Sequence, residues 1–202
     1  MSKLKLTSLT KHYETPFISV YDANYENEHT GYVKQYDFIS RSSGLTADNL
    51  GSVLPVNAVA ILAVDPERHR ILLTKEFRMT INQYLLSIPA GLMNGSETQE
   101  ETVRRELREE TGYTADRVRI LPAAFSCIGL TDEQVAASVV TVKPGRVEPK
   151  LEEAEDISSE WYSYEEAYRL VMDPQAKIGV RAQLLVLLWL ASEGMNVLGI
   201  RG

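Results

Sequence analysis

The sequence predicts a mixed α+β domain preceded by a small antiparallel β unit. Strand-like runs, one charged helix, further strands and two C-terminal helices follow one another along the 202 residues. That order favours helices packed on a sheet. A segment rich in Ser, Gly, Asn and Asp, 42–52, separates the first strands from the rest and is the candidate linker. We therefore expect one unit over residues 1–50 and a larger domain over 51–202.

The first unit is predicted from two β-branched and aromatic stretches. Phe17–Tyr25 and Tyr32–Ile39 flank a polar turn over 26–31, the pattern of a β-hairpin. A lone hairpin buries little apolar surface. It should therefore pack on the rest of the protein or on another chain.

The larger domain begins with Val56–Val64, which is nearly all apolar and predicts a buried strand. The turn over 65–69 leads into Arg70–Arg78 as its hairpin partner. Further strands are expected at Leu85–Ile88, Val118–Phe125 and Gln134–Val142, and helices at Ser163–Met172 and Gly179–Glu193.

Composition excludes several classes of function. The formal net charge is −7 and no block of Lys or Arg occurs, which argues against binding a nucleic-acid backbone. The single cysteine, Cys127, excludes an intrachain disulfide and fits a reducing compartment. The N-terminus lacks the apolar core of a signal peptide, and the longest apolar run, Leu184–Ala191, is too short to span a bilayer. We expect a cytoplasmic protein without membrane contact.

The chemistry-bearing residues lie on the charged helix. Thr98 and Glu101 have capping-box spacing, which predicts the start of the helix, and Gly112 stands where a left-handed stop is expected. Glu106 and Glu110 are one turn apart, so their carboxylates share a face. Oxygen-only clusters of this kind suit Mg²⁺ or Mn²⁺.

Arg105 precedes Glu109 by one turn and could hold that carboxylate by a two-pronged hydrogen bond. A solvated helix face with incidental ion pairs is, however, the commoner origin of such runs of Glu and Arg. The positions around the helix decide between these two interpretations.

The 23 residues from Gly91 to Tyr113 resemble the Nudix box. That motif is a glycine, five residues, a glutamate, seven residues, then Arg-Glu-aliphatic-any-Glu-Glu-any-Gly-aliphatic. The fixed positions present in register are Gly91, Glu97, Arg105, Glu106, Leu107, Glu109, Glu110 and Gly112. Only Tyr113 departs, standing where an aliphatic residue is usual.

The resemblance implies a Nudix fold and a role for each position. Glu106 and Glu110 would bind metal directly, with the backbone carbonyl of Ala90 completing the site. Glu109 would contribute a ligand or a nearby charge, and Arg105 would orient the acidic residues. Glu97 would support the helix and loop.

Outside the box, the chain resembles ADP-ribose and ADP-sugar pyrophosphatases. Gly129, Thr131, Asp132 and Glu133 fit a segment of that subfamily, and Gly129 and Glu133 become candidate substrate contacts. Ile128 stands where the marker proline would be.

Two further segments of that subfamily have counterparts. The acidic stretch Leu151–Ile157 would supply Glu153 as the catalytic base and Glu155 as a metal ligand, or else it is an acidic surface loop. The residues 75–78 resemble a Gln-Phe-Arg segment, so that Arg78 either contacts phosphate or sugar or is an ordinary strand-end arginine.

The resemblance thus implies metal-dependent hydrolysis of the pyrophosphate bond of a nucleoside diphosphate sugar, with ADP-ribose giving AMP and ribose 5-phosphate. GDP-mannose or another nucleotide sugar is an alternative substrate, and a non-catalytic nucleotide sensor is an alternative function. Enzymes of this subfamily are commonly homodimers, with which the N-terminal hairpin unit agrees. That unit would also stack the substrate's base, using one of its tyrosines: Tyr13, Tyr21, Tyr25, Tyr32 and Tyr36.

Overall fold

The computed structural model describes residues 3–52, 54–195 and 197, which form two compact units. The first unit contains Met1–Asn57 together with Ala123–Val135, and the second contains Ala58–Pro122 and Ala136–Gly202. The first unit therefore includes a segment that is distant in sequence from the N-terminal hairpin. The division into functional domains at residue 50 stays a prediction.

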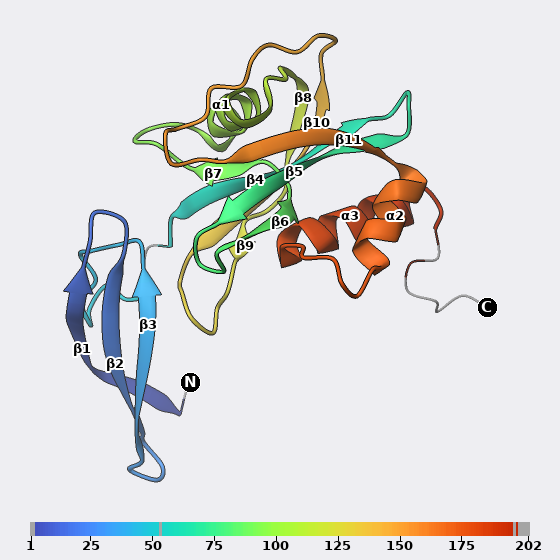
Figure 1. The fold of residues 1–202 in the computed structure, drawn as a ribbon. Coiled ribbons are helices and arrows are strands. Elements are labelled where there is room, and N and C mark those ends of the chain that lie inside the picture. Colours follow the sequence, from blue (N-terminus) through green and yellow to red (C-terminus); the bar gives the residue numbers. More distant parts are fainter. Residues whose placement is uncertain (1–2, 53, 196, 198–202) are drawn as a thin grey trace. The chain divides into compact units, whose positions relative to one another are not determined.

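The first unit is built on a three-stranded antiparallel sheet in the order β1-β2-β3 (Figure 1). Its strands are β1 (Leu4–Glu14), β2 (Ser19–Asn27) and β3 (Val33–Ser40). The hairpin β2–β3 agrees with the sequence, whereas β1 was not expected as a strand. Leu6 and Leu9 of β1 both pack on the cluster of Tyr21, Ala23 and Phe38, although they are three residues apart. A register shift between Leu6 and Ser8 allows this, and it hides the two-residue alternation of a strand.

The candidate linker folds back on the first unit. Leu45 and Leu50 pack against the same cluster, and the Tyr21 hydroxyl donates to the Ser42 carbonyl (2.9 Å). Asn49 closes a turn by accepting from the Thr46 amide (2.8 Å). The polar composition of this segment thus reflects turn geometry rather than an extended connection.

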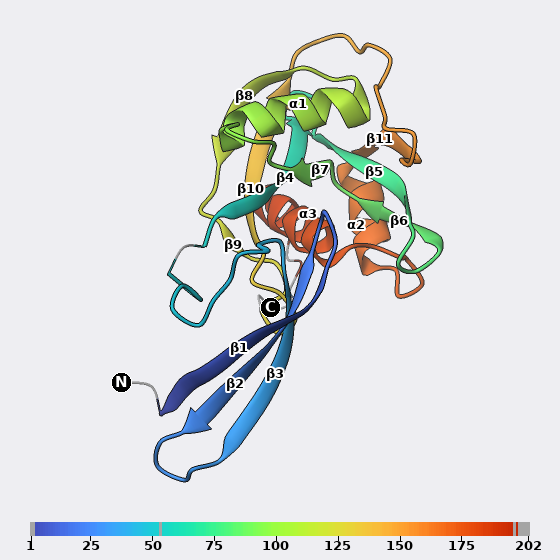
Figure 2. The ribbon, with the colours of Figure 1, turned by 90° about the vertical axis from the view of Figure 1, so that its left-hand side faces the viewer.

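The second unit is a mixed sheet in the order β11-β5-β4-β10-β8, with β6 paired to β5 and β7 paired to β4. Figures 1 and 2 show α1 on one face of this sheet and α2 and α3 on the other. The elements are β4 (Val56–Asp65), β5 (Arg70–Arg78), β6 (Gln83–Ser87), β7 (Ala90–Leu92), α1 (Gln99–Thr111), β8 (Ala115–Ile120), β10 (Gln134–Val142), β11 (Ile157–Ser163), α2 (Tyr164–Met172) and α3 (Val180–Ser192). The expected α+β class is confirmed.

The central strand β4 is buried over seven consecutive positions, Ala58–Val64, as its apolar run predicted. A strand covered on both faces cannot alternate between apolar and polar residues. Val59, Ile61 and Ala63 face the cluster that contains Val103 and Leu107 of α1. This cluster fixes the helix that carries the Nudix box against the sheet.

The expected strand Val118–Phe125 is split. β8 ends at Ile120, and β9 (Ala124–Phe125) pairs separately with the first residues of β10. Pro122 lies between the two strands and has no amide hydrogen for a sheet ladder. None of the described helices is long and apolar enough to cross a membrane.

Candidate metal and pyrophosphate site

Helix α1 positions the glutamates of the box through caps at both ends. At its start the Thr98 hydroxyl accepts from the Glu101 amide, and the Glu101 carboxylate accepts from the Thr98 amide (2.8 Å). At its end Gly112 has a φ of 74°, a left-handed conformation that disfavours a side chain. The predicted limits of this helix are thus found in the structure.

The segment after β10 forms hydrogen bonds with the C-terminal end of α1. The Val147 amide donates to the Gly112 carbonyl (3.0 Å), and the Lys150 amide donates to the Glu109 carbonyl (2.8 Å). Arg146 Nε donates to the Thr111 carbonyl (2.8 Å). These contacts satisfy carbonyls that a helix leaves without partners. They also tie the end of α1 to the chain that leads into the acidic loop.

Arg105 links the box residues to one another. Its Nε and Nη2 donate to the two oxygens of Glu97 (2.8 and 2.9 Å). Nη1 donates to Glu106 (2.7 Å) and to Glu109 (3.1 Å), and Nη2 also donates to the Leu92 carbonyl (3.0 Å). The expected two-pronged bond to Glu109 was therefore wrong. The two-pronged partner is Glu97, because the loop before the helix brings that carboxylate into the plane of the guanidinium.

The same contacts set the acidity of Glu97. The hydrogen bonds from Arg105 are the main reason why the pKa of Glu97 is lowered from its ordinary 4.5 to about 2. A carboxyl with a lowered pKa in the folded protein stabilises the fold fully above pH 4.5, and this contribution is lost as the pH falls towards 2.

We expect the thermal stability of Glu97→Gln to fall less steeply than that of the parent protein as the pH is lowered. Thermal unfolding of the metal-free protein between pH 5 and pH 2 is the measurement. The parent should lose more stability than Glu97→Gln over about that interval, since only the parent must protonate a carboxylate held by Arg105. Parallel profiles for the two proteins would contradict the assigned contact.

Glu106 and Glu110 are the buried carboxylates of the site. Glu106 is 9% exposed and Glu110 is 7% exposed. Burial raises the pKa of Glu106, although its hydrogen bond with Arg105 opposes the shift. Burial raises the pKa of Glu110 well above its ordinary value, and the charge of Glu106 adds to the effect. Both carboxylates lie on one helix face, and the negative charge of Glu106 makes the ionised form of Glu110 less favourable. A bound cation would favour the ionised form of both.

Gly91 permits this arrangement. A Cβ at Gly91 would lie 1.9 Å from Cδ and Oε1 of Glu106. The first glycine of the box is thus required by the close approach of a carboxylate. Ala90, immediately before it, donates its amide to Glu110 Oε2 (3.2 Å). That the Ala90 carbonyl is a metal ligand stays a prediction.

Glu76 is a further acidic residue near this site, and the sequence did not single it out. The charge of Glu76 contributes to the raised pKa of Glu110, and the charge of Glu155 raises the pKa of Glu76. Glu76 also forms an ion pair with Arg78 (3.1 Å). The pairing of Glu76 with Ile157 across β5 and β11 explains why the acidic loop lies nearby. Glu76 occupies the Gln position of the segment that resembles Gln-Phe-Arg, which is the signal that could have identified it.

The two loop glutamates are not equivalent. Burial is the main reason why the pKa of Glu106 and of Glu110 is raised, and the charge of Glu155 adds to both shifts. Glu155 also accepts from the Glu152 amide (2.9 Å). Glu153 is exposed and, among the residues that the structure describes, has no hydrogen bond or ion pair. Of the two loop glutamates, only Glu155 therefore contributes to the raised pKa values of the buried carboxylates.

The other two candidate substrate contacts belong to the first unit. The Gly129 carbonyl accepts from the Tyr36 hydroxyl (2.6 Å), and Glu133 accepts from Arg41 Nε (2.7 Å) and Ser126 Oγ (2.8 Å). Tyr21 is 1% exposed and stacks on Phe38, which removes it from the candidates for stacking a base.

The donor chemistry suits a hard divalent cation, because every candidate ligand is a carboxylate or backbone oxygen. As the side chains stand, no three His, Cys, Asp or Glu residues within 3–52, 54–195 and 197 are grouped closely enough to hold a metal ion. Arg105 occupies an oxygen of Glu106 and of Glu109. The carboxylates therefore fit a cation chemically, and binding requires their side chains to turn towards it.

Residues 54–184 match the family model described as the NUDIX domain. The chain belongs to the Nudix family. It is 42% identical over 78 residues to an ADP-ribose pyrophosphatase of Bacillus subtilis, covering 39% of this chain and 42% of that protein. It is 28% identical over 142 residues to an ADP-ribose pyrophosphatase of Escherichia coli, covering 66% and 67%.

A solved structure described as an ADP compounds hydrolase has the same fold, with a TM-score of 0.74 at 20% identity over 96% of this chain and 97% of that one. The chain spans less than half the length of the first curated relatives it matches. The Nudix assignment made from the box is confirmed by the family match.

Proposed function

We propose that this Nudix protein hydrolyses the pyrophosphate bond of a nucleoside diphosphate sugar, with ADP-ribose as the preferred substrate and AMP and ribose 5-phosphate as products. The observation that carries the proposal is the pair of buried carboxylates, Glu106 and Glu110, on one face of α1. Burying two charges of like sign is unfavourable unless a cation balances them. Relatives named ADP-ribose pyrophosphatase support the choice of substrate.

Glu106, Glu110 and Glu155 would hold Mg²⁺ or Mn²⁺ in this proposal, with the Ala90 carbonyl as a further ligand. A divalent cation supplies charge neutralisation of the diphosphate and lowers the pKa of a bound water. Arg105 would keep Glu106 and Glu109 oriented, since its hydrogen bonds reach both. Arg78 would contact the substrate, whereas Gly129 and Glu133 stay contacts predicted from the sequence alone.

The experiment is AMP release from ADP-ribose with excess Mg²⁺, alongside ADP-glucose, GDP-mannose, NADH and nucleoside triphosphates, each with an EDTA control. We expect metal-dependent cleavage with ADP-ribose preferred. Preference for GDP-mannose or another nucleotide sugar would keep the reaction and contradict the substrate. Absence of cleavage for every compound would contradict the enzyme and favour a nucleotide sensor.

The loop glutamates provide a second test. Because the charge of Glu155, unlike that of Glu153, adds to the raised pKa of Glu106 and Glu110, we expect Glu155→Gln to weaken activation by Mg²⁺. If the acidic loop moves onto bound substrate, Glu153→Gln should lower kcat with little effect on the Mg²⁺ requirement, as expected for a base. Measuring kcat against Mg²⁺ concentration separates the two roles. If neither variant differed from the parent, the acidic loop would have no part in the reaction.

The proposal includes a homodimer in a reducing, cytoplasmic compartment. The lone cysteine, Cys127, is exposed and suits such a compartment. Light scattering during size-exclusion chromatography tests the dimer, and a particle of one 22.7 kDa chain would contradict it.

A further inference from the structure

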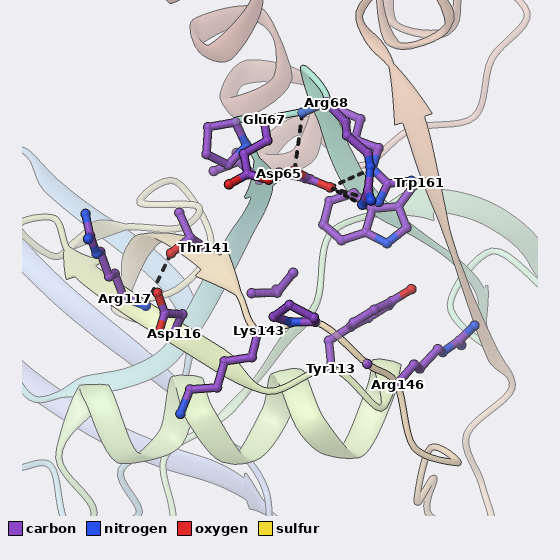
Figure 3. A pocket seen from close by; sticks show the side chains of 16 residues that line it. Asp65, Glu67, Arg68, Tyr113, Asp116, Arg117, Thr141, Lys143, Arg146 and Trp161 are labelled. Atoms are coloured by element: carbon purple, nitrogen blue, oxygen red, sulfur yellow. Dashed lines mark hydrogen bonds and ion pairs between the residues drawn. The ribbon is translucent and has the colours of Figure 1, made fainter.

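The second unit contains a cavity that the catalytic proposal does not use. It has a volume of about 760 Å³ and lies among the turn between β4 and β5, the start of β8, the end of β10 and the strand β11 (Figure 3). This volume falls within the usual range for sites that bind small molecules, roughly 300–1,000 Å³. All of its lining residues belong to the second unit.

The cavity is separate from the buried carboxylates. Strand β5 contributes Arg70 to the cavity, whereas Glu76, which influences Glu110, lies six residues further along the same strand. A strand rises about 3.3 Å per residue, so the two positions are about 20 Å apart. The cavity approaches the end of α1 at Tyr113, but none of the acidic residues of the candidate metal site lines it.

An aromatic pair forms one wall. The rings of Tyr113 and Trp161 meet edge to face, with centroids 5.5 Å apart and planes at 74°. The guanidinium of Arg70 lies 4.7 Å from the centre of the Trp161 ring, and that of Arg146 lies 5.5 Å from the centre of the Tyr113 ring. Each ring is thus covered by a planar guanidinium, a group on which an aromatic ring can itself stack.

The cavity is basic although the chain is acidic. Five basic and three acidic residues line it, in a protein whose formal net charge is −7. One of the acids, Asp65, is already paired with Arg68 and Arg70. Lys143 and Arg117 form no ion pair within the described part of the chain. Two cations without carboxylate partners beside an aromatic wall favour an anionic ligand.

We propose that this cavity binds a small phosphorylated ligand with a planar ring, of the size of a nucleoside monophosphate. The phosphate would contact Lys143 and Arg117, and the ring would pack against Tyr113 and Trp161. Figure 3 shows Arg117 on one side of the cavity and the aromatic pair on the other. The inference is independent of the proposed hydrolysis.

The fluorescence of Trp161 can report the binding of a ligand in the cavity. The chain has two tryptophans, and the second, Trp189, is 7% exposed and packs on α2 through Tyr164. We expect AMP, added to the full chain in EDTA, to change the tryptophan fluorescence saturably, and Trp161→Phe to abolish the change. Adenosine and inorganic phosphate should each bind at least about tenfold more weakly, because each offers one half of the contacts. No saturable change, or inorganic phosphate binding as tightly as AMP, would overturn the proposal.

Charge reversal tests the cationic side of the cavity. The double variant Arg117→Glu and Lys143→Glu should weaken AMP binding by at least about tenfold. Arg119→Glu is the matched control, because Arg119 is exposed on the same strand, β8, and does not line the cavity. AMP affinities that are equal in the double variant and the control would overturn the assignment of Arg117 and Lys143. EDTA prevents turnover, so this result does not depend on whether the chain is an active hydrolase.

Discussion

Glu110→Gln should abolish most of the hydrolysis while leaving the metal-free protein at least as stable as the parent. The carboxylate is 7% exposed, and its pKa is raised well above the ordinary value by burial and by Glu106. A carboxyl whose folded pKa is raised costs stability above its unfolded pKa, and the cost grows until the pH passes the folded pKa. The amide removes that cost, and its oxygen can still accept from the Ala90 amide.

The loss of activity should be large because the variant removes a charge that would bind the cation. Metal stabilisation of transition-state charge is worth several kcal/mol, so we expect turnover to fall about 10³-fold or more. Added Mg²⁺ should raise the thermal midpoint of the parent and not that of the variant, since only a bound ligand stabilises the folded state.

Glu100→Gln is the matched control for this result. Glu100 lies in the first turn of the same helix, where it pairs with Arg104 at the surface (2.7 Å). The same chemical change there should leave turnover and the Mg²⁺-induced shift as in the parent. Hydrolysis at the parent rate in Glu110→Gln would remove this residue from the metal site.

Gly91→Ala should lower turnover about 10²-fold with a small effect on folding. The new Cβ would lie 1.9 Å from the Glu106 carboxylate, so the end of that side chain must move and its 2.7 Å hydrogen bond with Arg105 must break. A misplacement of about 1 Å in a reacting group is enough for a 10²-fold loss. The fold should survive, because the atoms in the way are the flexible end of a side chain rather than backbone.

The measurements are kcat with saturating Mg²⁺ and thermal unfolding in EDTA. Gly44→Ala is the control, since nothing lies within 4 Å of a Cβ at Gly44. That variant should keep both the parent activity and the parent midpoint. Parent-like turnover in Gly91→Ala would show that the position of Glu106 seen in the structure does not matter for the reaction.

The box could be identified from sequence because its geometry is local. Caps at Thr98 and Gly112 set the limits of α1, and the spacing of Glu106 and Glu110 places both carboxylates on one helix face. The buried strand Ala58–Val64 was also predictable, because a strand covered on both faces leaves a continuous apolar run. These features depend on neighbours within a few residues in the chain.

The missed features depend on contacts between distant segments. Glu76 reaches the acidic loop through the pairing of β5 with β11, a register that no local pattern specifies. Strand β1 was missed because a register shift breaks its alternation. Arg105 forms its bidentate hydrogen bond with Glu97 rather than with Glu109. The loop before the helix, and not the helix periodicity, sets the position of the Glu97 carboxylate.

The sequence by itself determined the family and the helix with its paired carboxylates, and it led to the prediction of a hard cation. The tertiary structure alone decided that Gly91 is needed for the approach of Glu106, that the charge of Glu155 rather than Glu153 acts on the buried acids, and that a basic cavity opens beside Tyr113 and Trp161. The physical reason is the range of the interactions. Helix periodicity and capping act over one or two turns, whereas burial, electrostatic coupling and cavities arise only when distant segments pack together.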